Sequence, residues 1–333
     1  MEENTEQRVD LTLFSEKIQE LKDRIASVIV GQEQTVDLVL TAILANGHVL
    51  IEGVPGVAKT LLARLTARLI DADFSRVQFT PDLMPSDVLG TTVFNMKTNG
   101  FDFHQGPIFA DIVLVDEINR APAKTQAALF EVMEERQISI DGTTHRMGDL
   151  YTILATQNPV EQEGTYKLPE AQLDRFLMKI TMDYPSLEEE VNILERHHTN
   201  AALVKLDDIV PAITKEELLS LRAFMNQVFV DRTLLQYIAL IVQQTRTSKA
   251  VYLGASPRAS VAMLQSSKAY ALLQGRDFVT PEDIKFVAPY VLQHRLILTA
   301  EAEMEGYSPV KVTQRLIDKV EVPKCKRFMI YEF

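Results

Sequence analysis

The sequence predicts an α/β fold in which a doubly wound parallel sheet is followed by an all-α domain. Short apolar runs alternate with helical stretches over residues 48–182, and several runs are continuous, as expected for strands buried on both faces of a parallel sheet. From residue 185 to about residue 298 the apolar spacing is helical almost throughout. We therefore expect an α/β core with N-terminal helices over residues 1–184 and an all-α domain over residues 185–333.

The elements of the predicted core follow in a regular order. Helical spacing comes first, over residues 11–30 and 34–45, and further helices are expected over 60–70 and 122–135. The apolar runs that we interpret as strands are 48–51, 75–79, 111–115, 150–155 and 176–182.

Two intervals break this alternation. Residues 91–104 carry β-forming residues on both sides of Thr98-Asn99-Gly100, and residues 137–147 do the same around Asp141-Gly142. Asn-Gly and Asp-Gly steps supply the positive φ angles that a tight two-residue turn requires. We therefore expect two β-hairpins inserted into the core.

Helix-start signals mark the all-α part. Ser186 is followed by three glutamates, which is typical of an N-cap and a first helical turn. Thr280-Pro281 begins another helix, since Pro is favoured at the first helical position.

Composition excludes some classes of protein. The 333 residues are 46% hydrophobic and carry a formal net charge of −12, which disfavours binding to duplex DNA because such binding needs clustered positive charge. The N-terminus lacks the apolar segment of a signal peptide, and no apolar run is long enough to span a bilayer. The single cysteine, Cys325, cannot form an internal disulfide. We expect a cytoplasmic protein without membrane insertion.

The segment GVPGVAKT at residues 53–60 lies between a predicted strand and a predicted helix, which is the context of a phosphate-binding loop. The backbone N–H groups of such a loop face the phosphates, Lys59 reaches the β- and γ-phosphates, and Thr60 ligates Mg²⁺. Ala58 stands where Gly is usual, and we expect it to adopt an ordinary negative φ at the helix start. The alternative interpretation is a simple glycine turn.

Asp116 and Glu117 end the apolar run over 112–115. They would lie at the carboxyl edge of the sheet, where ligands bind in open α/β folds. Asp116 would hold Mg²⁺ through water, and Glu117 would act as general base on the attacking water. In isolation, two solvated carboxylates at a helix start would explain the pattern equally well.

Three further polar residues are candidates for the same chemistry. Asn158 follows a predicted strand and could orient the lytic water, although Asn before Pro is also a common turn former. Arg175, after a short helix beginning at Pro169, could serve as an arginine finger for a neighbouring subunit or could pair with Asp174. Arg258, at a helix start in the all-α part, could sense the γ-phosphate or be surface charge.

In chain order, the segments GVPGVAKT, DEINRA, ATQNP, LDRF and SPRA resemble the MoxR family of AAA+ ATPases. The resemblance extends from VIVGQE at 28–33 to HRLIL at 294–298, and TPDLMPSDVLG and GPIFADIVLVDEINRAP are very specific to that family. Ala58 is similar to what family members show.

The resemblance implies an AAA+ core with an all-α lid and gives the candidate residues their roles. It implies Walker A over Gly53–Thr60, Walker B at Asp116 and Glu117, sensor 1 at Asn158, the arginine finger at Arg175 and sensor 2 at Arg258. The implied residues for ATP are Ile29, Val30, Gly31, Gln32, Gly53, Val54, Pro55, Gly56, Val57, Ala58, Lys59, Thr60 and Leu61, and those for Mg²⁺ are Thr60 and Asp116.

The family's hairpin insertions face the central pore of a ring. The resemblance therefore implies a homo-hexameric remodelling ATPase that acts on a protein client, with roles in complex maturation or metal-centre assembly and with partners that contain von Willebrand factor A domains. Two alternatives share the ATP machinery: a nucleic-acid-directed AAA+ protein of the helicase or helicase-loader type, and a binding module that uses ATP as a switch.

Overall fold

The computed structural model describes residues 11–158, 166, 168–199 and 209–323. Cys325 and both chain ends lie outside the described residues, as does part of the segment between Asn158 and Leu168. Packing of the backbone divides the chain into two compact units, one of residues 21–219 and one of residues 1–20 together with 220–333. The domain boundary predicted between residues 184 and 185 stays a prediction.

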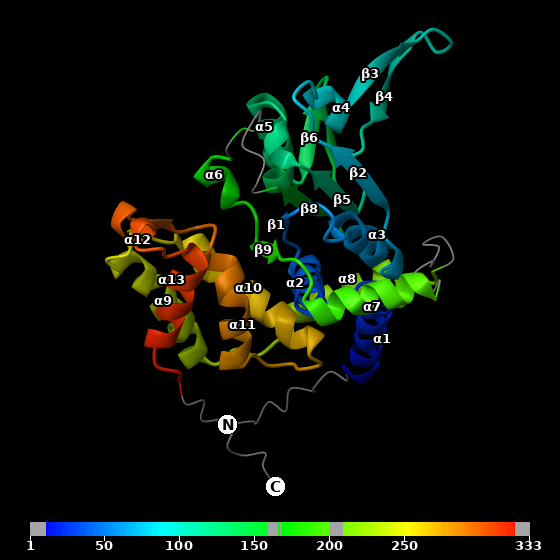
Figure 1. Cartoon of the computed structure of the whole chain (residues 1–333). Coiled ribbons are helices and arrows are strands. Elements are labelled where there is room, and N and C mark those ends of the chain that lie inside the picture. Colours follow the sequence, from blue (N-terminus) through cyan, green and yellow to red (C-terminus); the bar gives the residue numbers. More distant parts are fainter. Residues whose placement is uncertain (1–10, 159–165, 167, 200–208, 324–333) are drawn as a thin grey trace, which may run out of the picture. The chain divides into compact units, whose positions relative to one another are not determined.

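A five-stranded parallel sheet forms the centre of the first unit, with the order β2-β5-β8-β1-β9 (Figure 1). The strands are β1 (Val49–Gly53), β2 (Phe74–Gln78), β5 (Ile112–Asp116), β8 (Thr152–Gln157) and β9 (Met178–Met182). Each lies within about two residues of a strand predicted from the apolar runs. The doubly wound parallel core is therefore confirmed.

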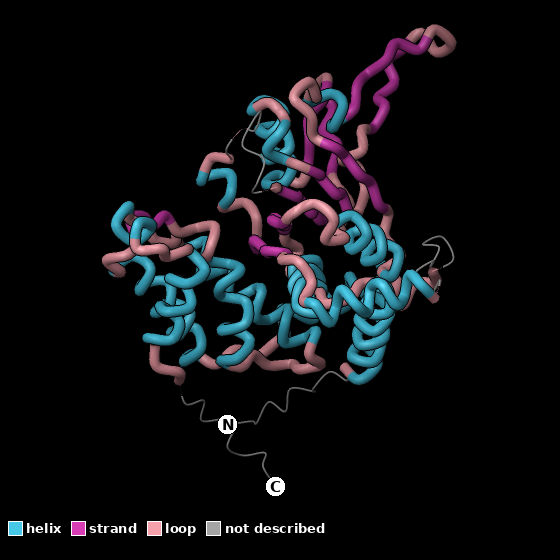
Figure 2. Tube along the Cα trace, in the orientation of Figure 1, coloured by secondary structure: helices cyan, strands magenta, loops and turns pink. Residues whose placement is uncertain are grey.

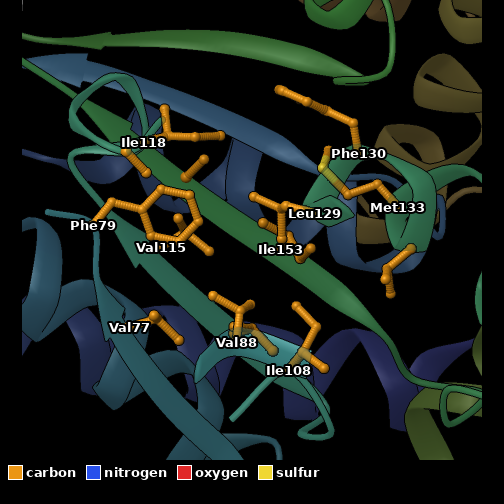
Figure 3. Close-up of a cluster of buried hydrophobic side chains, with 14 of the residues drawn as sticks. Val77, Phe79, Val88, Ile108, Val115, Ile118, Leu129, Phe130, Met133 and Ile153 are labelled. Atoms are coloured by element: carbon orange, nitrogen blue, oxygen red, sulfur yellow. The ribbon is translucent and has the colours of Figure 1, made fainter. Parts of the chain in front are cut away.

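Helices cover this sheet on both faces. Val113 and Val115 of β5 join a buried cluster with α5, which Figure 3 shows around Phe79, Leu129 and Ile153. Ile112 and Leu114 alternate with these residues and are equally buried, so they face the opposite side, where α3 packs against β5. The helices of this unit are the later part of α1 (Thr12–Val28), α2 (Glu33–Leu44), α3 (Lys59–Leu69), α4 (Pro85–Leu89), η1 (Ile118–Arg120), α5 (Ala123–Glu135), α6 (Glu170–Leu173), α7 (Leu187–His198) and the start of α8 (Lys215–Phe224).

Both predicted hairpins are present. In the hairpin of β6 (Gln137–Ile140) and β7 (Thr143–Arg146), Asp141 and Gly142 have φ of +49° and +79° and form the predicted two-residue turn. The hairpin of β3 (Gly90–Asn95) and β4 (Gly100–Gln105) projects beyond the sheet (Figure 2). Its predicted two-residue turn is wrong: Asn95 pairs with Gly100, so the loop holds four residues, 96–99, and Gly100 belongs to the strand.

The second unit is mainly helical. Its elements are η3 (Met225–Gln227), α9 (Arg232–Thr247), β10 (Val251–Leu253), α10 (Pro257–Leu273), α11 (Pro281–Leu292), β11 (Ile297–Leu298), α12 (Ala300–Met304) and α13 (Pro309–Lys319). The pair β10–β11 was not predicted, because runs of two and three residues are too short to show a period.

The predicted helix starts are confirmed. Ser186 and Glu189 form a reciprocal capping box at the start of α7, and Thr280 and Asp283 form one at the start of α11. In the second case Asp283 is buried and also accepts two hydrogen bonds from Arg276, so the cap is tied to a buried ion pair. Within the described residues, we find no helix with the length and apolar character needed to cross a bilayer.

Candidate nucleotide-binding site

The loop between β1 and α3 is shaped by two glycines. A Cβ on Gly53 would lie 2.6 Å from the backbone oxygen of Met182, so only glycine allows β1 to approach β9 this closely. Gly56 has φ of +89° and open space around its Cα, which favours glycine for conformational reasons alone. The loop leads directly into α3, whose first residue is Lys59.

The expectation for Ala58 is wrong. Ala58 adopts a left-handed conformation, with φ of +62° and ψ of +23°, and acts as the N-cap of α3. The loop must reverse direction here so that the first N–H groups of α3 turn back toward it, and this needs a positive φ. Ala58 therefore keeps the backbone geometry of the usual glycine and is strained by its own Cβ.

Lys59 and Thr60 occupy the first turn of α3, followed by Leu61. Lys59 Nζ donates a hydrogen bond to the Gly53 oxygen over 2.5 Å, so the ammonium group bridges the loop from its last to its first residue. The N–H groups of the first helical turn have no intrahelical acceptors, which makes this end of α3 suited to an anion.

Asp116 ends β5 and is buried, with 7% of the residue exposed. Arg76 Nε donates to Asp116 Oδ2 over 2.6 Å, and the Thr156 hydroxyl donates to Asp116 Oδ1 over 3.1 Å. The same hydroxyl oxygen accepts the Glu117 N–H over 3.0 Å. Thr156 therefore couples the two carboxylate residues from the neighbouring strand β8.

Glu117 is held in an unusual backbone conformation, with φ of +56°. Its Oε2 accepts hydrogen bonds from Gln78 Nε2 over 2.8 Å and from Arg120 Nη1 over 2.9 Å. A non-glycine residue with positive φ is uncommon, and such strain often marks a functional position.

Asn158 follows β8 directly and is buried. Because β8 lies between β5 and β1, the carboxyl ends of the three strands are neighbours at one edge of the sheet. The topology thus brings together the β1–α3 loop, the Asp116-Glu117 pair and Asn158, at the edge where open α/β folds bind ligands.

The segment from Ile29 to Gln32 connects α1 to α2, and Gly31 within it has φ of +72°. A Cβ on Gly31 would lie 2.3 Å from Glu189 Oε1, so the start of α7 packs directly against this connection. Arg196, about two turns further along α7, donates to the Ser27 oxygen over 2.6 Å.

Arg175 follows α6 and pairs with α5. Its Nε and Nη2 lie 2.8 Å and 2.7 Å from the same oxygen, Glu134 Oε2, and its guanidinium lies 6.0 Å from the centre of the Phe130 ring. This ion pair joins residues 41 positions apart, which differs from the local pairing with Asp174 that the sequence also allowed. Arg258 is exposed in the first turn of α10 and belongs to the helical unit.

Four residues that hydrogen-bond to Asp116 or Glu117 were not predicted from the sequence: Arg76, Gln78, Arg120 and Thr156. Arg76 and Gln78 alternate on β2, so both project to the same side, and their polar character was a visible signal. Their relevance depends on β2 lying next to β5, which the sequence alone does not reveal.

The donor set fits Mg²⁺ better than a metal held by protein ligands alone. Within the described ranges, no three His, Cys, Asp or Glu side chains come together as a metal cluster. Mg²⁺ commonly uses one or two protein oxygens and takes its remaining ligands from phosphates and water. The Thr60 hydroxyl and the buried Asp116 carboxylate are ligands of that kind.

Comparison with known proteins agrees with this geometry. The family model described as "ATPase family associated with various cellular activities (AAA)" matches residues 48–178, and the "AAA lid domain" model matches residues 243–318. Chaperone MoxR1 of Mycobacterium tuberculosis is 44% identical over 90% of this chain and 81% of its own length. The chain belongs to the MoxR family of AAA+ ATPases.

Two further relatives support this membership. The protein YeaC of Bacillus subtilis is 47% identical over 90% of this chain and 93% of its own. A crystal structure from Cytophaga hutchinsonii, solved as a candidate ATPase, superimposes with a TM-score of 0.87 at 40% identity and covers 95% of this chain and 97% of that one. This MoxR-family chain is therefore an enzyme that hydrolyses ATP, with an AAA+ core and a helical lid.

Proposed function

We propose that this MoxR-family ATPase hydrolyses Mg²⁺-bound ATP at the edge formed by β5, β8 and β1. The observation that carries the proposal is the adjacency of the β1–α3 loop, Asp116 and Asn158 at the carboxyl ends of three neighbouring strands. Their side chains come from segments up to about one hundred residues apart, so the arrangement is a property of the fold.

The backbone N–H groups of the loop from Gly53 to Lys59, which Pro55 lacks, would cradle the phosphates, and the Lys59 ammonium would exchange the Gly53 oxygen for a phosphate oxygen. Thr60 and Asp116 would hold Mg²⁺, which when bound neutralises charge on the phosphates. Glu117 would accept the proton of the attacking water, and Asn158 would orient that water. Ile29, Val30, Gly31 and Gln32 would line the adenine pocket.

We further propose a homo-hexameric ring in which Arg175 reaches the γ-phosphate of a neighbouring subunit and Arg258 senses nucleotide from the lid. Such shared sites make turnover depend on assembly. Arg175 is partly exposed, and it pairs with Glu134 of α5 and not with a residue of the β1–α3 loop. This position supports a role toward another subunit.

The client is proposed to be a protein. Phe94 and Phe101 stack edge to face across the β3–β4 hairpin with ring centres 5.3 Å apart, and both are exposed. Exposed aromatic residues on a projecting hairpin are suited to contact an unfolded chain. The name of Chaperone MoxR1 and the acidic charge of the chain support this over a nucleic acid. Metal-centre insertion and partners with von Willebrand factor A domains remain part of the proposal on family grounds.

Two variants test the proposed site. Glu117→Gln should bind ATP with near wild-type affinity and lose hydrolysis, because the amide keeps the shape of the side chain but cannot accept a proton. Arg175→Ala should also bind ATP and lose roughly 10³-fold or more of its turnover. Calorimetry measures binding and phosphate release measures turnover. Normal hydrolysis by either variant would refute the role assigned to that residue, and Glu117→Gln would also serve to trap clients during purification.

A further inference from the structure

We propose that Glu134 on α5 is a positioning residue for Arg175, which it holds in the direction needed to reach a neighbouring subunit. The proposal rests on the function proposed for Arg175. It adds that the finger is oriented in advance by its own subunit, so that assembly does not have to order a freely rotating arginine.

The geometry of the pair favours positioning over simple neutralisation. A single carboxylate oxygen of Glu134 receives both Nε and Nη2, at 2.8 Å and 2.7 Å. The guanidinium carries five N–H donors in a planar fork, so a contact along its Nε–Nη2 edge leaves the Nη1 edge for a phosphate. Fixing two donors on one side of a planar group also fixes the direction of the other side.

The support beneath the pair is rigid. The Arg175 guanidinium lies 6.0 Å from the ring centre of Phe130, which is 1% exposed and belongs to the main buried cluster. Phe130 in turn meets Phe176, the residue after Arg175, edge to face at 5.9 Å. The backbone at Arg175 and the α5 platform are therefore held together by core packing, and only the outer part of the arginine side chain depends on Glu134.

The surroundings leave room beside the arginine. A cavity of about 190 Å³ lies against the pair, lined in part by Glu131, Glu135 and Gln172. Arg175 and Glu134 themselves line this cavity, so without the bond to Glu134 the guanidinium could turn toward the carboxylate of Glu131 or Glu135. Glu131 and Glu135 lie on the same helix, carry the same charge and are exposed, which makes them matched controls.

The first test is steady-state ATPase kinetics of full-length variants, measured at a protein concentration high enough that the ring is fully assembled. Glu134→Ala should lower kcat roughly 10- to 100-fold with KM within about twofold, because a displacement of about 1 Å in a catalytic group costs up to about 10²-fold. Glu134→Gln should keep part of kcat, since its amide oxygen still accepts from Nε. Glu131→Gln and Glu135→Gln should stay near wild type. An unchanged or raised kcat in Glu134→Ala would overturn the proposal, and a raised kcat would show that Glu134 restrains the finger instead.

The second test separates this proposal from the role of Arg175. Subunits with Glu117→Gln keep the finger and lack the base, and subunits with Arg175→Ala keep the base and lack the finger. Mixed rings of the two should regain hydrolysis above either parent. Adding Glu134→Ala to the Glu117→Gln subunit should reduce this regained activity roughly 10-fold or more, and adding it to the Arg175→Ala subunit should not change it.

Each outcome of the mixing test has one meaning. Equal loss of activity with Glu134→Ala on either subunit would show a general structural effect and would overturn the positioning role while leaving the finger intact. If Arg175→Ala alone keeps full turnover, the proposed finger fails and the positioning role fails with it. We expect the melting temperature of Glu134→Ala, followed by circular dichroism, to equal that of the wild type. We also expect the mixed rings to lose activity only when Glu134→Ala is placed on the Glu117→Gln subunit, which supplies the finger.

Discussion

Arg76 on the edge strand β2 forms an ion pair of 2.6 Å with Asp116 at the end of β5, so a cation already neutralises the carboxylate that we propose for Mg²⁺. The pairing is a direct result of strand order, because Arg76 and Asp116 lie on neighbouring strands two residues apart in register. Arg76 is exposed and Asp116 is buried, so the arginine can move into solvent while the carboxylate cannot.

We predict that Arg76 competes with Mg²⁺ for Asp116. Arg76→Gln should lower the Mg²⁺ concentration for half-maximal hydrolysis roughly two- to fivefold, which corresponds to the modest energy of a half-exposed ion pair. A titration of ATPase activity against Mg²⁺ at fixed ATP measures this. Lys97→Gln, at the exposed tip of the β3–β4 hairpin, makes the same change in charge and should leave the titration unchanged. A higher Mg²⁺ requirement in Arg76→Gln would show that the arginine assists binding.

The left-handed Ala58 gives a prediction about stability. Ala58→Gly should raise the free energy of unfolding by about 0.5–1 kcal/mol, because relief of about 1–2 kcal/mol of strain exceeds the added entropy of glycine in the unfolded chain. Urea unfolding followed by circular dichroism is suitable, since the chain contains no Trp for fluorescence. Ala127→Gly in the middle of α5 is the control and should lower the free energy of unfolding by about 1 kcal/mol. If both variants lose stability, Ala58 is not strained.

The loop around Ala58 has some features that the local sequence predicts and one that it does not. The loop, its lysine and the Asp116-Glu117 pair are local motifs, so their place between strand and helix could be predicted from neighbouring residues. The φ of Ala58 could not, because it is imposed by the closure of the loop onto α3. The hairpins differ in the same way: Asp141-Gly142 forms its turn locally, whereas the turn at Asn99 is set by pairing across the strands that places Asn95 opposite Gly100.

The network around the carboxylates was beyond the sequence for a related reason. Thr156 and Gln78 contact Asp116 and Glu117 from the neighbouring strands β8 and β2, whereas Arg120 contacts Glu117 from only three residues further along the chain. The order of strands decides which side chains become neighbours, and an apolar run carries no information about that order. Glu134 was missed likewise, because it lies on α5, 41 residues before Arg175.

The projecting hairpin gives a prediction about clients. Phe101 is 74% exposed and Phe94 is 47% exposed, so replacing both with Ser should lower the free energy of unfolding by only about 0.5–1.5 kcal/mol, which is the contribution of one cross-strand aromatic pair. Binding of an unfolded model protein, such as fluorescein-labelled casein in the presence of ATP, should fall at least about tenfold with two aromatic anchors removed. ATP hydrolysis without client should stay within about twofold.

Thr98→Ser in the loop of the same hairpin is the control and should bind casein as the wild type does. Undiminished binding by the Phe94→Ser/Phe101→Ser variant would exclude the aromatic pair as the contact.

The buried His48 makes the α/β unit sensitive to acid. Burial, and to a smaller extent the positive charge of Arg136, lowers the pKa of His48 to about 3. Its Nδ1 accepts the Ile153 N–H over 3.0 Å, which requires that Nε2 carry the proton and donate to the Met133 oxygen over 3.1 Å. A second proton on Nδ1 would face the Ile153 N–H, so the folded protein holds His48 neutral.

Because the folded pKa is lowered, the unfolded chain binds the additional proton between about pH 6.5 and pH 3, and stability is lost as the pH falls through this window. We expect the free energy of unfolding to drop by about 1 kcal/mol between pH 7.5 and pH 5.5 on account of His48, a range in which most carboxylates stay ionised. His48→Gln should be less stable at both pH values but should lose this part of the slope. His104→Gln, a change at an exposed histidine, should keep the wild-type dependence of the free energy of unfolding on pH. If His48→Gln also kept that dependence, groups other than His48 would govern the loss of stability in acid.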